Sequence, residues 1–213
     1  METISIHKPK VVVIGSCNTD MVVKANRLPV PGETVLGGTF YMNPGGKGAN
    51  QAIAASRLGA EVTFISKIGY DLFGLQALEI YKSEKINTEF IFTDQKSPSG
   101  VALISVDSFG ENSIIVAPGA SRSLSIEDIN KAEEKIKEAD IILMQLEVPI
   151  ETAEFAATIA NKYNKKVILN PAPASTLSDT FLRNIHTILP NRIEAEMLSG
   201  IKVIDIELSL IHI

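Results

Sequence analysis

The sequence predicts an α/β fold built on a doubly wound, mainly parallel sheet that is sandwiched by helices, with a small antiparallel β sheet projecting from it. One observation is the repeated order of strand and helix patterns along most of the chain, which is typical of βαβ units. A second is that the strand patterns are short apolar runs rich in β-branched residues, as in strands buried on both faces. The third is a pair of segments with alternating polar and apolar residues, which interrupt this order.

Five apolar runs predict the strands of the main sheet. They cover residues 11–14, 62–65, 141–146, 167–169 and 187–189. Helical spacing of apolar residues predicts helices over 49–58, 71–85, 125–138, 150–163 and 192–199. Two of these helices have clear ends, because Ser125 with Asp128 three residues later is a capping signal and Gly59 follows the first helix.

The two interrupting segments, residues 19–43 and 91–117, are predicted to form the projecting β lid. Both contain short alternating runs separated by proline and glycine, which is typical of hairpins. Residues 1–18, 44–90 and 118–213 would then form the α/β body. The local sequence fits either a lid that closes over a ligand or a face that pairs two subunits.

The composition indicates a globular protein, because 213 residues with 45% hydrophobic content are enough for a full core. The net charge is −5 and the Lys and Arg residues are scattered, which argues against a nucleic-acid partner. The short polar start has neither a signal h-region nor a membrane span, so we expect a cytoplasmic protein without membrane contact. Cys17, the single cysteine, is expected to be a buried thiol, and the scattered histidines give no zinc spacing.

A glycine-rich turn in residues 43–51 is the clearest sign of a ligand site. Three glycines surround Lys47 at the start of a predicted helix. Glycines let the backbone approach a ligand, while the lysine and the first helical amides supply donors for an anionic or polyhydroxyl group. The spacing is neither that of a P-loop, since Ala49 stands where the hydroxyl should be, nor Gly-x-Gly-x-x-Gly. Taken alone, the turn could equally be a structural entry into a helix.

Polar side chains follow most of the predicted strands, at the edge where an open α/β sheet binds its ligands. They are Asn18, Asp20, Glu147, Asn170, Asn191 and Glu194. Any one of them is more often the cap of a turn or helix. Together with the glycine turn they are expected to converge on one crevice, where carboxylates and amides bind the vicinal hydroxyls of a sugar. Glu194 could also hold Mg²⁺ through water beside a nucleotide triphosphate, so the sequence predicts a site for a polyol and a phosphate.

Eight motifs, in this order along residues 11–204, resemble those of the ribokinase-like (PfkB) family of carbohydrate kinases. They are Gly15-Ser16-Cys17-Asn18-Thr19-Asp20, Pro31-Gly32-Glu33-Thr34, Gly45-Gly46-Lys47-Gly48-Ala49-Asn50-Gln51-Ala52, Gly69-Tyr70-Asp71-x-x-Gly74, Ser99-Gly100-Val101-Ala102, Met144-Gln145-Leu146-Glu147, Asn170-Pro171-Ala172-Pro173 and Pro190-Asn191-x-x-Glu194. Within the family, the first and sixth motifs are more similar to the ribokinase branch than to the fructokinases.

The resemblance implies transfer of the γ-phosphoryl group of ATP to a sugar, with D-ribose phosphorylated at O5 as the favoured reaction. It implies a sugar site formed by Asn18, Thr19, Asp20, Gly46, Lys47, Gly48, Ala49, Asn50 and Glu147. Asn191 would contact the ATP phosphates, and Glu194 would act through water on Mg²⁺. The β segments would form the lid and pair two subunits into a homodimer, and full-length family members use a monovalent cation, K⁺.

One family motif does not occur in the 213 residues, namely Gly-Ala-Gly-Asp, whose aspartate is the base that the resemblance implies. Residues 206–213 also do not resemble the family's continuation. We therefore expect an N-terminal fragment that lacks the catalytic base, the K⁺ site and the C-terminal part of the fold, with an exposed sheet edge and little or no kinase activity. The alternatives are another sugar or nucleoside kinase of the family, such as a deoxyribokinase or fructokinase, and a non-catalytic sugar-binding module.

Overall fold

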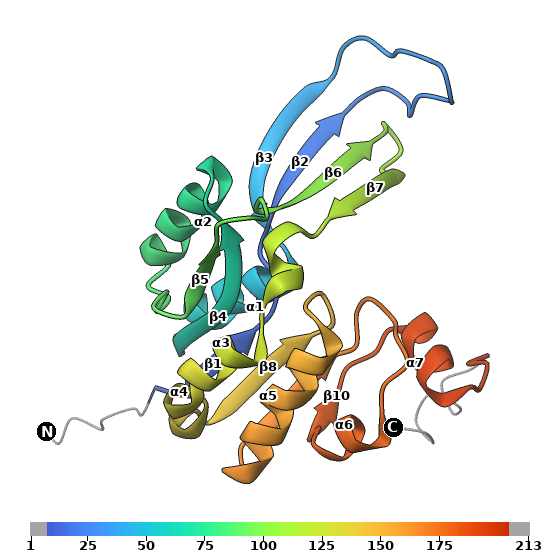
Figure 1. Cartoon of the computed structure of the whole chain (residues 1–213). Coiled ribbons are helices and arrows are strands. Elements are labelled where there is room, and N and C mark those ends of the chain that lie inside the picture. Colours follow the sequence, from blue (N-terminus) through green and yellow to red (C-terminus); the bar gives the residue numbers. More distant parts are fainter. Residues whose placement is uncertain (1–7, 205–213) are drawn as a thin grey trace, which may run out of the picture.

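The computed structural model describes residues 8–204, which form two β sheets (Figure 1). The larger sheet has six strands in the order β10-β9-β8-β1-β4-β5, and every pairing in it is parallel. Its strands are β1 (Lys10–Ile14), β4 (Glu61–Gly69), β5 (Ile91–Asp94), β8 (Ile141–Gln145), β9 (Lys166–Asn170) and β10 (Thr187–Ile188). The five predicted strands of the main sheet are confirmed, and a sixth lies at its edge.

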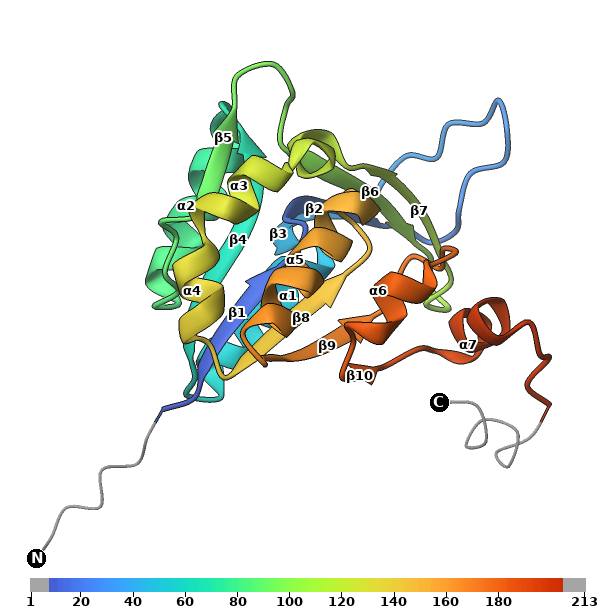
Figure 2. The ribbon, with the colours of Figure 1, turned by 60° about the horizontal axis from the view of Figure 1, so that its bottom comes forward.

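Helices cover both faces of this sheet, which confirms the doubly wound fold (Figures 1 and 2). One face carries α1 (Lys47–Arg57) and α2 (Leu72–Ser83). The other face carries α3 (Ile126–Lys131), α4 (Glu133–Glu138), α5 (Ile150–Lys162) and α6 (Asp179–Arg183). The chain also forms a 3₁₀ turn, η1 (Gly119–Ser123), and a last helix, α7 (Arg192–Ser199), beyond β10.

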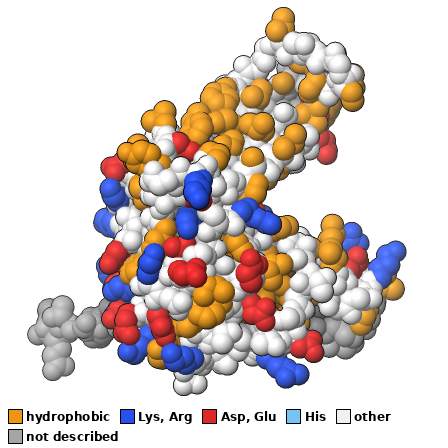
Figure 3. Space-filling view, viewed as in Figure 1, with side chains coloured by type: hydrophobic (Ala, Val, Ile, Leu, Met, Phe, Trp, Pro, Cys, Tyr) orange, Lys and Arg blue, Asp and Glu red, His pale blue; other side chains and the backbone are white. Residues whose placement is uncertain are grey.

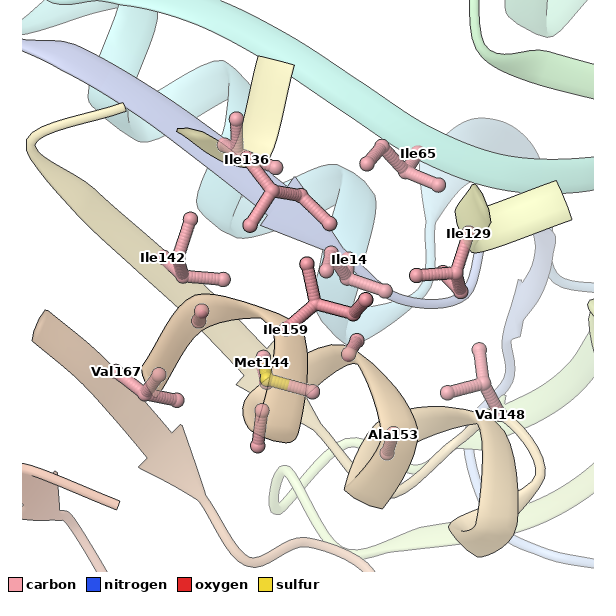
Figure 4. Packing of buried hydrophobic residues seen from close by; sticks show 14 of the residues in the cluster. Ile14, Ile65, Ile129, Ile136, Ile142, Met144, Val148, Ala153, Ile159 and Val167 are labelled. Carbon is pink, nitrogen blue, oxygen red and sulfur yellow. The ribbon is translucent and has the colours of Figure 1, made fainter. Parts of the chain in front are cut away.

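Successive residues of β1 point into two separate cores, because side chains alternate along a strand. Val13 packs with Phe64 in the core under α1 and α2. Ile14 packs with Ile142 in the core under α3 to α6 (Figure 4). Each of these side chains is fully buried, and burying one stabilises the fold by roughly 1.5–3 kcal/mol. Burial on both faces explains why the strands read as continuous apolar runs.

The smaller sheet, which we call the projecting sheet, extends away from the body (Figures 1 and 2). It contains β2 (Asn18–Lys24), β3 (Thr39–Gly45), β6 (Gly100–Val106) and β7 (Asn112–Ala117), in the order β3-β2-β6-β7. The outer pairs are antiparallel, as predicted, whereas β2 and β6 run parallel to each other. The parallel pair joins strands that lie far apart in the sequence.

The predicted lid boundary is wrong at residues 91–94. These residues form β5, which pairs in parallel with β4 at the edge of the six-stranded sheet. Ile91 contributes to the core under α1 and α2, whereas Phe92 packs against the core on the other face. A four-residue strand with two apolar residues gives too short a pattern to distinguish an edge strand of the main sheet from a hairpin strand.

The predicted helices are confirmed, with two differences. The segment predicted as one helix over 125–138 is two short helices, α3 and α4, that meet at Ala132. The amide of Ala132 bonds to the carbonyl of Ile129, three residues back, so the turn is tighter there than in an α-helix. The short helix α6 was not predicted. No helix in residues 8–204 is long and apolar enough to cross a bilayer.

Candidate functional site

The candidate site lies where the ends of β1 and β8 meet the start of α1, at the base of the projecting sheet. Ser16 follows β1, Lys47 is the first residue of α1, and Glu147 follows β8. Glu147 is 131 positions from Ser16 and 100 positions from Lys47, and it is hydrogen-bonded to both. The parallel topology brings them together, because the carboxyl ends of parallel strands share one edge of the sheet.

Glu147 is held by three donors. Its Oε2 accepts from Ser16 Oγ at 2.5 Å and from the backbone N of Lys47 at 3.0 Å. Its Oε1 forms an ion pair with Lys47 Nζ. Burial acts to raise the pKa of Glu147, but the hydrogen bonds from Lys47 and Ser16 outweigh it and lower the pKa. Glu147 is therefore an ionised acceptor at neutral pH.

Asp20 is the second carboxylate of the site and has the opposite pKa shift. Burial raises its pKa, the negative charge of Glu147 raises it further, and Lys47 opposes both. The carboxylate packs on Gly45 of the neighbouring strand, where a Cβ would lie 2.0 Å from Asp20 Oδ1. Gly45 is thus required for close packing between β2 and β3.

The glycine turn holds α1 against the end of β1. Gly46 has a φ of +90° and precedes α1 without a side-chain cap. Two of the first three helical amides have partners in the protein, because the N–H of Lys47 donates to Glu147 and that of Ala49 donates to Ser16 O at 3.0 Å. The turn therefore differs from an anion cradle with free amides, and it fits a neutral, hydroxyl-rich ligand better.

Asn18 contributes a buried acceptor. Its side chain lies at the base of the projecting sheet, and its Oδ1 has no hydrogen-bond partner within residues 8–204. Asn18 is 7% exposed. An unpartnered buried oxygen is costly for the fold, so this atom is suited to a donor that a ligand supplies.

Not every residue of the predicted sugar site faces the others. Ala49 is fully buried in the core under α1 and α2, so its side chain is structural. Thr19 lies between Asn18 and Asp20 on β2, so its side chain points to the opposite face of the sheet from theirs. A cavity of about 80 Å³ at this end of β2 is lined by both Asn18 and Thr19, together with Phe73. Asn50 is exposed on α1, and Gly48, like Gly46, contributes backbone only.

The predicted ATP and magnesium residues form a helix cap. Asn191 Oδ1 accepts from the backbone N of Glu194 at 2.9 Å, and Glu194 Oε2 accepts from the backbone N of Asn191 at 2.8 Å. Glu194 Oε1 accepts from Asn191 Nδ2 at 2.9 Å. The two residues are a capping box for α7. Asn170, the other strand-end amide, donates to Leu189 O at 3.0 Å and ties β9 to the loop after β10.

The described part of the chain has no group of three or more His, Cys, Asp or Glu side chains that could hold a metal ion. Glu194 is 6% exposed, and both of its oxygens accept from Asn191. Direct coordination of a metal by this carboxylate does not fit this arrangement. The role of Glu194 toward Mg²⁺ through water stays a prediction.

The surface is hollowed between the projecting sheet and the body (Figure 3). A separate pocket of about 280 Å³ lies beside the start of α5, and it is lined by Leu146, Val148 and Arg122 among others. None of the predicted sugar-binding residues lines that pocket. The polar cluster around Glu147 is therefore distinct from it.

Two residues of this region, Ser16 and Asp71, have partners that the sequence did not predict. Ser16 and Asp71 belong to the quoted motifs, but a serine or aspartate in a loop has many possible partners. Their partners lie 131 and 28 positions away, at Glu147 and Ser99. Cys17 is buried as predicted, and burial raises its pKa to about 11, which does not suit a nucleophile.

Comparisons with known proteins agree with this architecture. Residues 8–211 match the family model described as pfkB family carbohydrate kinase. The chain is 46% identical over 193 residues to the ribokinase of Haemophilus influenzae, which covers 91% of this chain and 63% of that protein. It is 38% identical over 194 residues to the deoxyribokinase of Salmonella typhi, with 91% and 63% covered.

The fold also matches a solved structure, that of an Arabidopsis thaliana ribokinase complexed with ribose and ATP, with a TM-score of 0.83 and 30% identity. The match covers 94% of this chain and 66% of that one. The chain thus spans 63% of the length of each of the two curated relatives above. Because the family model matches nearly the whole sequence, over the strands that carry the polar cluster, the chain belongs to the pfkB family of carbohydrate kinases.

Proposed function

We propose that this chain forms the sugar-binding part of a ribokinase, which transfers the γ-phosphoryl group of ATP to O5 of D-ribose. The observation that carries the proposal is the cluster of Asp20, Lys47 and Glu147 beside the unpartnered oxygen of Asn18. The identity to ribokinases and the likeness to a structure with ribose and ATP support it.

The cluster has the donors and acceptors that a pentose needs. Ionised Glu147 and Asp20 accept hydrogen bonds from vicinal hydroxyls, and Lys47 donates a hydrogen bond to a hydroxyl or ring oxygen. Asn18 Oδ1 accepts a hydrogen bond from one further hydroxyl, which gives this buried oxygen a partner. Each hydrogen bond to a charged group contributes roughly 1.5–3 kcal/mol, so a few of them are enough for selective binding.

The transfer itself is proposed to proceed in line, with positioning and charge neutralisation contributing most of the rate. Asn191 lies at the start of α7 beside the last strand, where it could meet a phosphate of ATP, and Mg²⁺ and K⁺ stay predictions from the family resemblance. The 213 residues contain no Gly-Ala-Gly-Asp segment. A polypeptide of these residues alone is therefore expected to bind sugar and to transfer phosphate slowly or not at all.

A homodimer formed through the projecting sheet is part of the proposal. The register places Phe40, Met42, Leu103 and Ile115 on the face of this sheet opposite to Asp20, because paired residues share a face. These side chains are between 42% and 69% exposed. Apolar side chains also gather over the projecting sheet in Figure 3. A second copy of the chain would cover such a face.

Calorimetric titration of the chain with D-ribose tests the sugar site. We expect Asp20→Ala and Lys47→Ala to weaken binding roughly tenfold to a hundredfold, from the loss of one charged hydrogen bond. Glu84→Gln is the matched control, since Glu84 pairs with Arg57 on the body surface. Equal affinity of all four proteins for ribose would place the site elsewhere.

Two further measurements separate the rivals. Titration with 2-deoxyribose and fructose compares the affinity of the chain for these sugars with its affinity for ribose. A deoxyribokinase is one rival, because a deoxyribokinase is a relative at 38% identity. A coupled assay for ADP formation with ribose and ATP distinguishes a kinase from a sugar-binding module. Ribose-dependent ADP formation at the rate of a full-length ribokinase would contradict the expected low activity of the 213-residue polypeptide.

A further inference from the structure

All four strands of the projecting sheet join the body at the same end of that sheet. β2 begins at Asn18 and β6 begins at Gly100, and these two residues are paired. β3 ends at Gly45, which also pairs with Asn18. β7 ends at Ala117, which pairs with Val101 next to the start of β6. Any movement of the projecting sheet relative to the body must therefore be centred on this end, which we call the sheet base.

Asp71 holds the chain at the sheet base through Ser99, the residue before β6. Its Oδ2 accepts from the backbone N of Ser99 at 2.7 Å, and its Oδ1 accepts from Ser99 Oγ at 2.7 Å. Ser99 Oγ in turn accepts from the backbone N of Gly69 at 3.0 Å. Asp71 Oδ1 also accepts from the backbone N of Gly74 at 2.9 Å, which caps α2. One carboxylate therefore ties together the end of β4, the start of α2 and the start of β6.

Glycines allow the backbone to close tightly around Ser99. A Cβ on Gly69 would lie 2.4 Å from Ser99 N, and a Cβ on Gly74 would lie 2.9 Å from Ser99 Oγ. A Cβ on Gly119, in the chain that leaves β7, would lie 2.8 Å from Ser99 C. These separations are too short for real side chains, so the position of Ser99 is set closely by its surroundings.

Gly100 connects Ser99 to the proposed sugar site. A Cβ on Gly100 would lie 2.1 Å from Asn18 Oδ1, the buried acceptor without a partner. Asp20 lies two residues further along β2 and pairs with Ala102 of β6. A shift of β6 at the sheet base would therefore displace both Asn18 and Asp20.

We propose that Asp71 and Ser99 are positioning residues, which fix the sheet base and thereby hold Asn18 and Asp20 in the geometry that binds the sugar. The part of this proposal that concerns the sugar rests on the proposed function. The part that concerns the sheet base rests on the contacts of Ser99 alone.

Capping of α2 does not account for this arrangement. A cap needs one oxygen, and Asp71 Oδ1 supplies it to Gly74. Asp71 Oδ2 is directed at the backbone N of Ser99, which lies 28 positions away in the sequence. Burial acts against ionisation of Asp71, but the hydrogen bonds from Gly74 and Ser99 outweigh it and lower its pKa.

The substitution Asp71→Ser separates the two roles, because serine is a good N-cap for α2 but is too short to hold Ser99 as well. We expect amides of β2 and β6 next to the sheet base to exchange with deuterium about tenfold faster or more, and the affinity for D-ribose to fall by a similar factor. Ser99→Ala should shift both in the same direction by less, since it removes the hydroxyl but keeps the backbone bond. Ser125→Ala is the control, because it removes the N-cap of α3 and leaves Ser99 untouched.

Hydrogen exchange tests the positioning role of Asp71 and Ser99, whereas ribose affinity also tests the proposed sugar site. Faster exchange with weaker ribose binding, at a melting temperature close to that of Ser125→Ala, supports the positioning role. Unchanged exchange in both Asp71→Ser and Ser99→Ala overturns it, whether or not ribose binds. If the unmodified chain binds no ribose, the proposed function fails and the exchange rates alone decide the role of the sheet base. If Asp71→Ser does not fold, Ser99→Ala decides by the same criteria.

Discussion

At the scale of single residues, the candidate site contains two carboxylates with opposite pKa shifts. Glu147 is half-buried, which raises its pKa, but donors from Lys47 and Ser16 outweigh this and lower it. Asp20 has fewer donors, so burial and the nearby Glu147 raise its pKa. The motifs predicted Lys47, Asp20 and Glu147 as neighbours. They could not predict the role of Ser16, because its hydroxyl acts through a partner that only the folded chain brings near.

The raised pKa of Asp20 should make the proposed sugar binding sensitive to acid. A carboxylate whose folded-state pKa lies above its ordinary 3.8 takes up its proton earlier as the pH falls, and protonated Asp20 accepts hydroxyl protons poorly. We therefore expect the affinity for ribose to fall, as the pH is lowered from neutral, already above pH 3.8. Calorimetry at a series of pH values measures this, and Asp20→Asn should remove the dependence.

Glu147 should behave differently in the same series. Its pKa is lowered from 4.5, so its stabilising contribution is present above that value and is lost as the pH falls through the lowered value. It stays ionised where Asp20 is being protonated. A pH dependence that persists unchanged in Asp20→Asn would assign the titration to another group.

At the scale of the elements, capping residues explain where α3 and α7 begin. Ser125 with Asp128 and Asn191 with Glu194 both form capping boxes. The same chemistry explains why strand-end residues are hard to assign, since a capping carboxylate and a metal-binding carboxylate look alike in a sequence. The structure shows Glu194 in the capping box of α7. Any further role of this carboxylate must be compatible with the hydrogen bonds that both of its oxygens accept from Asn191.

Asn191→Ala should destabilise α7 by about 1 kcal/mol, because the amide of Glu194 and the side chain of Glu194 both lose a partner. Glu194→Gln should have a smaller effect, since glutamine also completes a capping box. Hydrogen exchange of the α7 amides and thermal unfolding measure both variants. Equal stability of Asn191→Ala and the unmodified chain would show that the cap contributes little.

The elements that were predicted poorly are those that depend on distant neighbours. β5 is a strand because β4 lies beside it and because Ile91 and Phe92 find separate cores on the two faces. α3 and α4 are separate because the helix tightens at Ala132, between the buried residues Ile129 and Ile136. Neither the neighbouring strand nor the tightened turn leaves a signal in a short window of sequence.

At the scale of the whole molecule, the two sheets bury their side chains differently. The strands of the body are covered on both faces by helices, whereas the projecting sheet leaves apolar residues on both of its faces exposed. The order of motifs along the chain predicted the body and its hairpin-like appendage. It could not predict that β2 and β6 are parallel partners. Between these two strands the sequence forms β3, α1, β4, α2 and β5.

The face of the projecting sheet that carries Phe40, Met42, Leu103 and Ile115 predicts self-association, because these apolar side chains are exposed. Sedimentation analysis at micromolar concentration should show a dimer, and Ile115→Lys should shift the chain to a monomer by placing a charge on the contact face. Ile114→Lys is the matched control, because Ile114 lies on the same strand and faces the other way. Equal effects of the two substitutions, or a monomeric unmodified chain, would contradict this face as the interface.

The projecting sheet meets the body at one end only, which matters for engineering. Since β2, β3, β6 and β7 all cross to the body at one end, only four short junctions would need to match if the sheet were exchanged for that of a relative. Such a transplanted sheet would bring its own surface to the proposed sugar site while keeping the host's Lys47 and Glu147. Preference among pentoses and hexoses could then be altered without redesigning either helical layer.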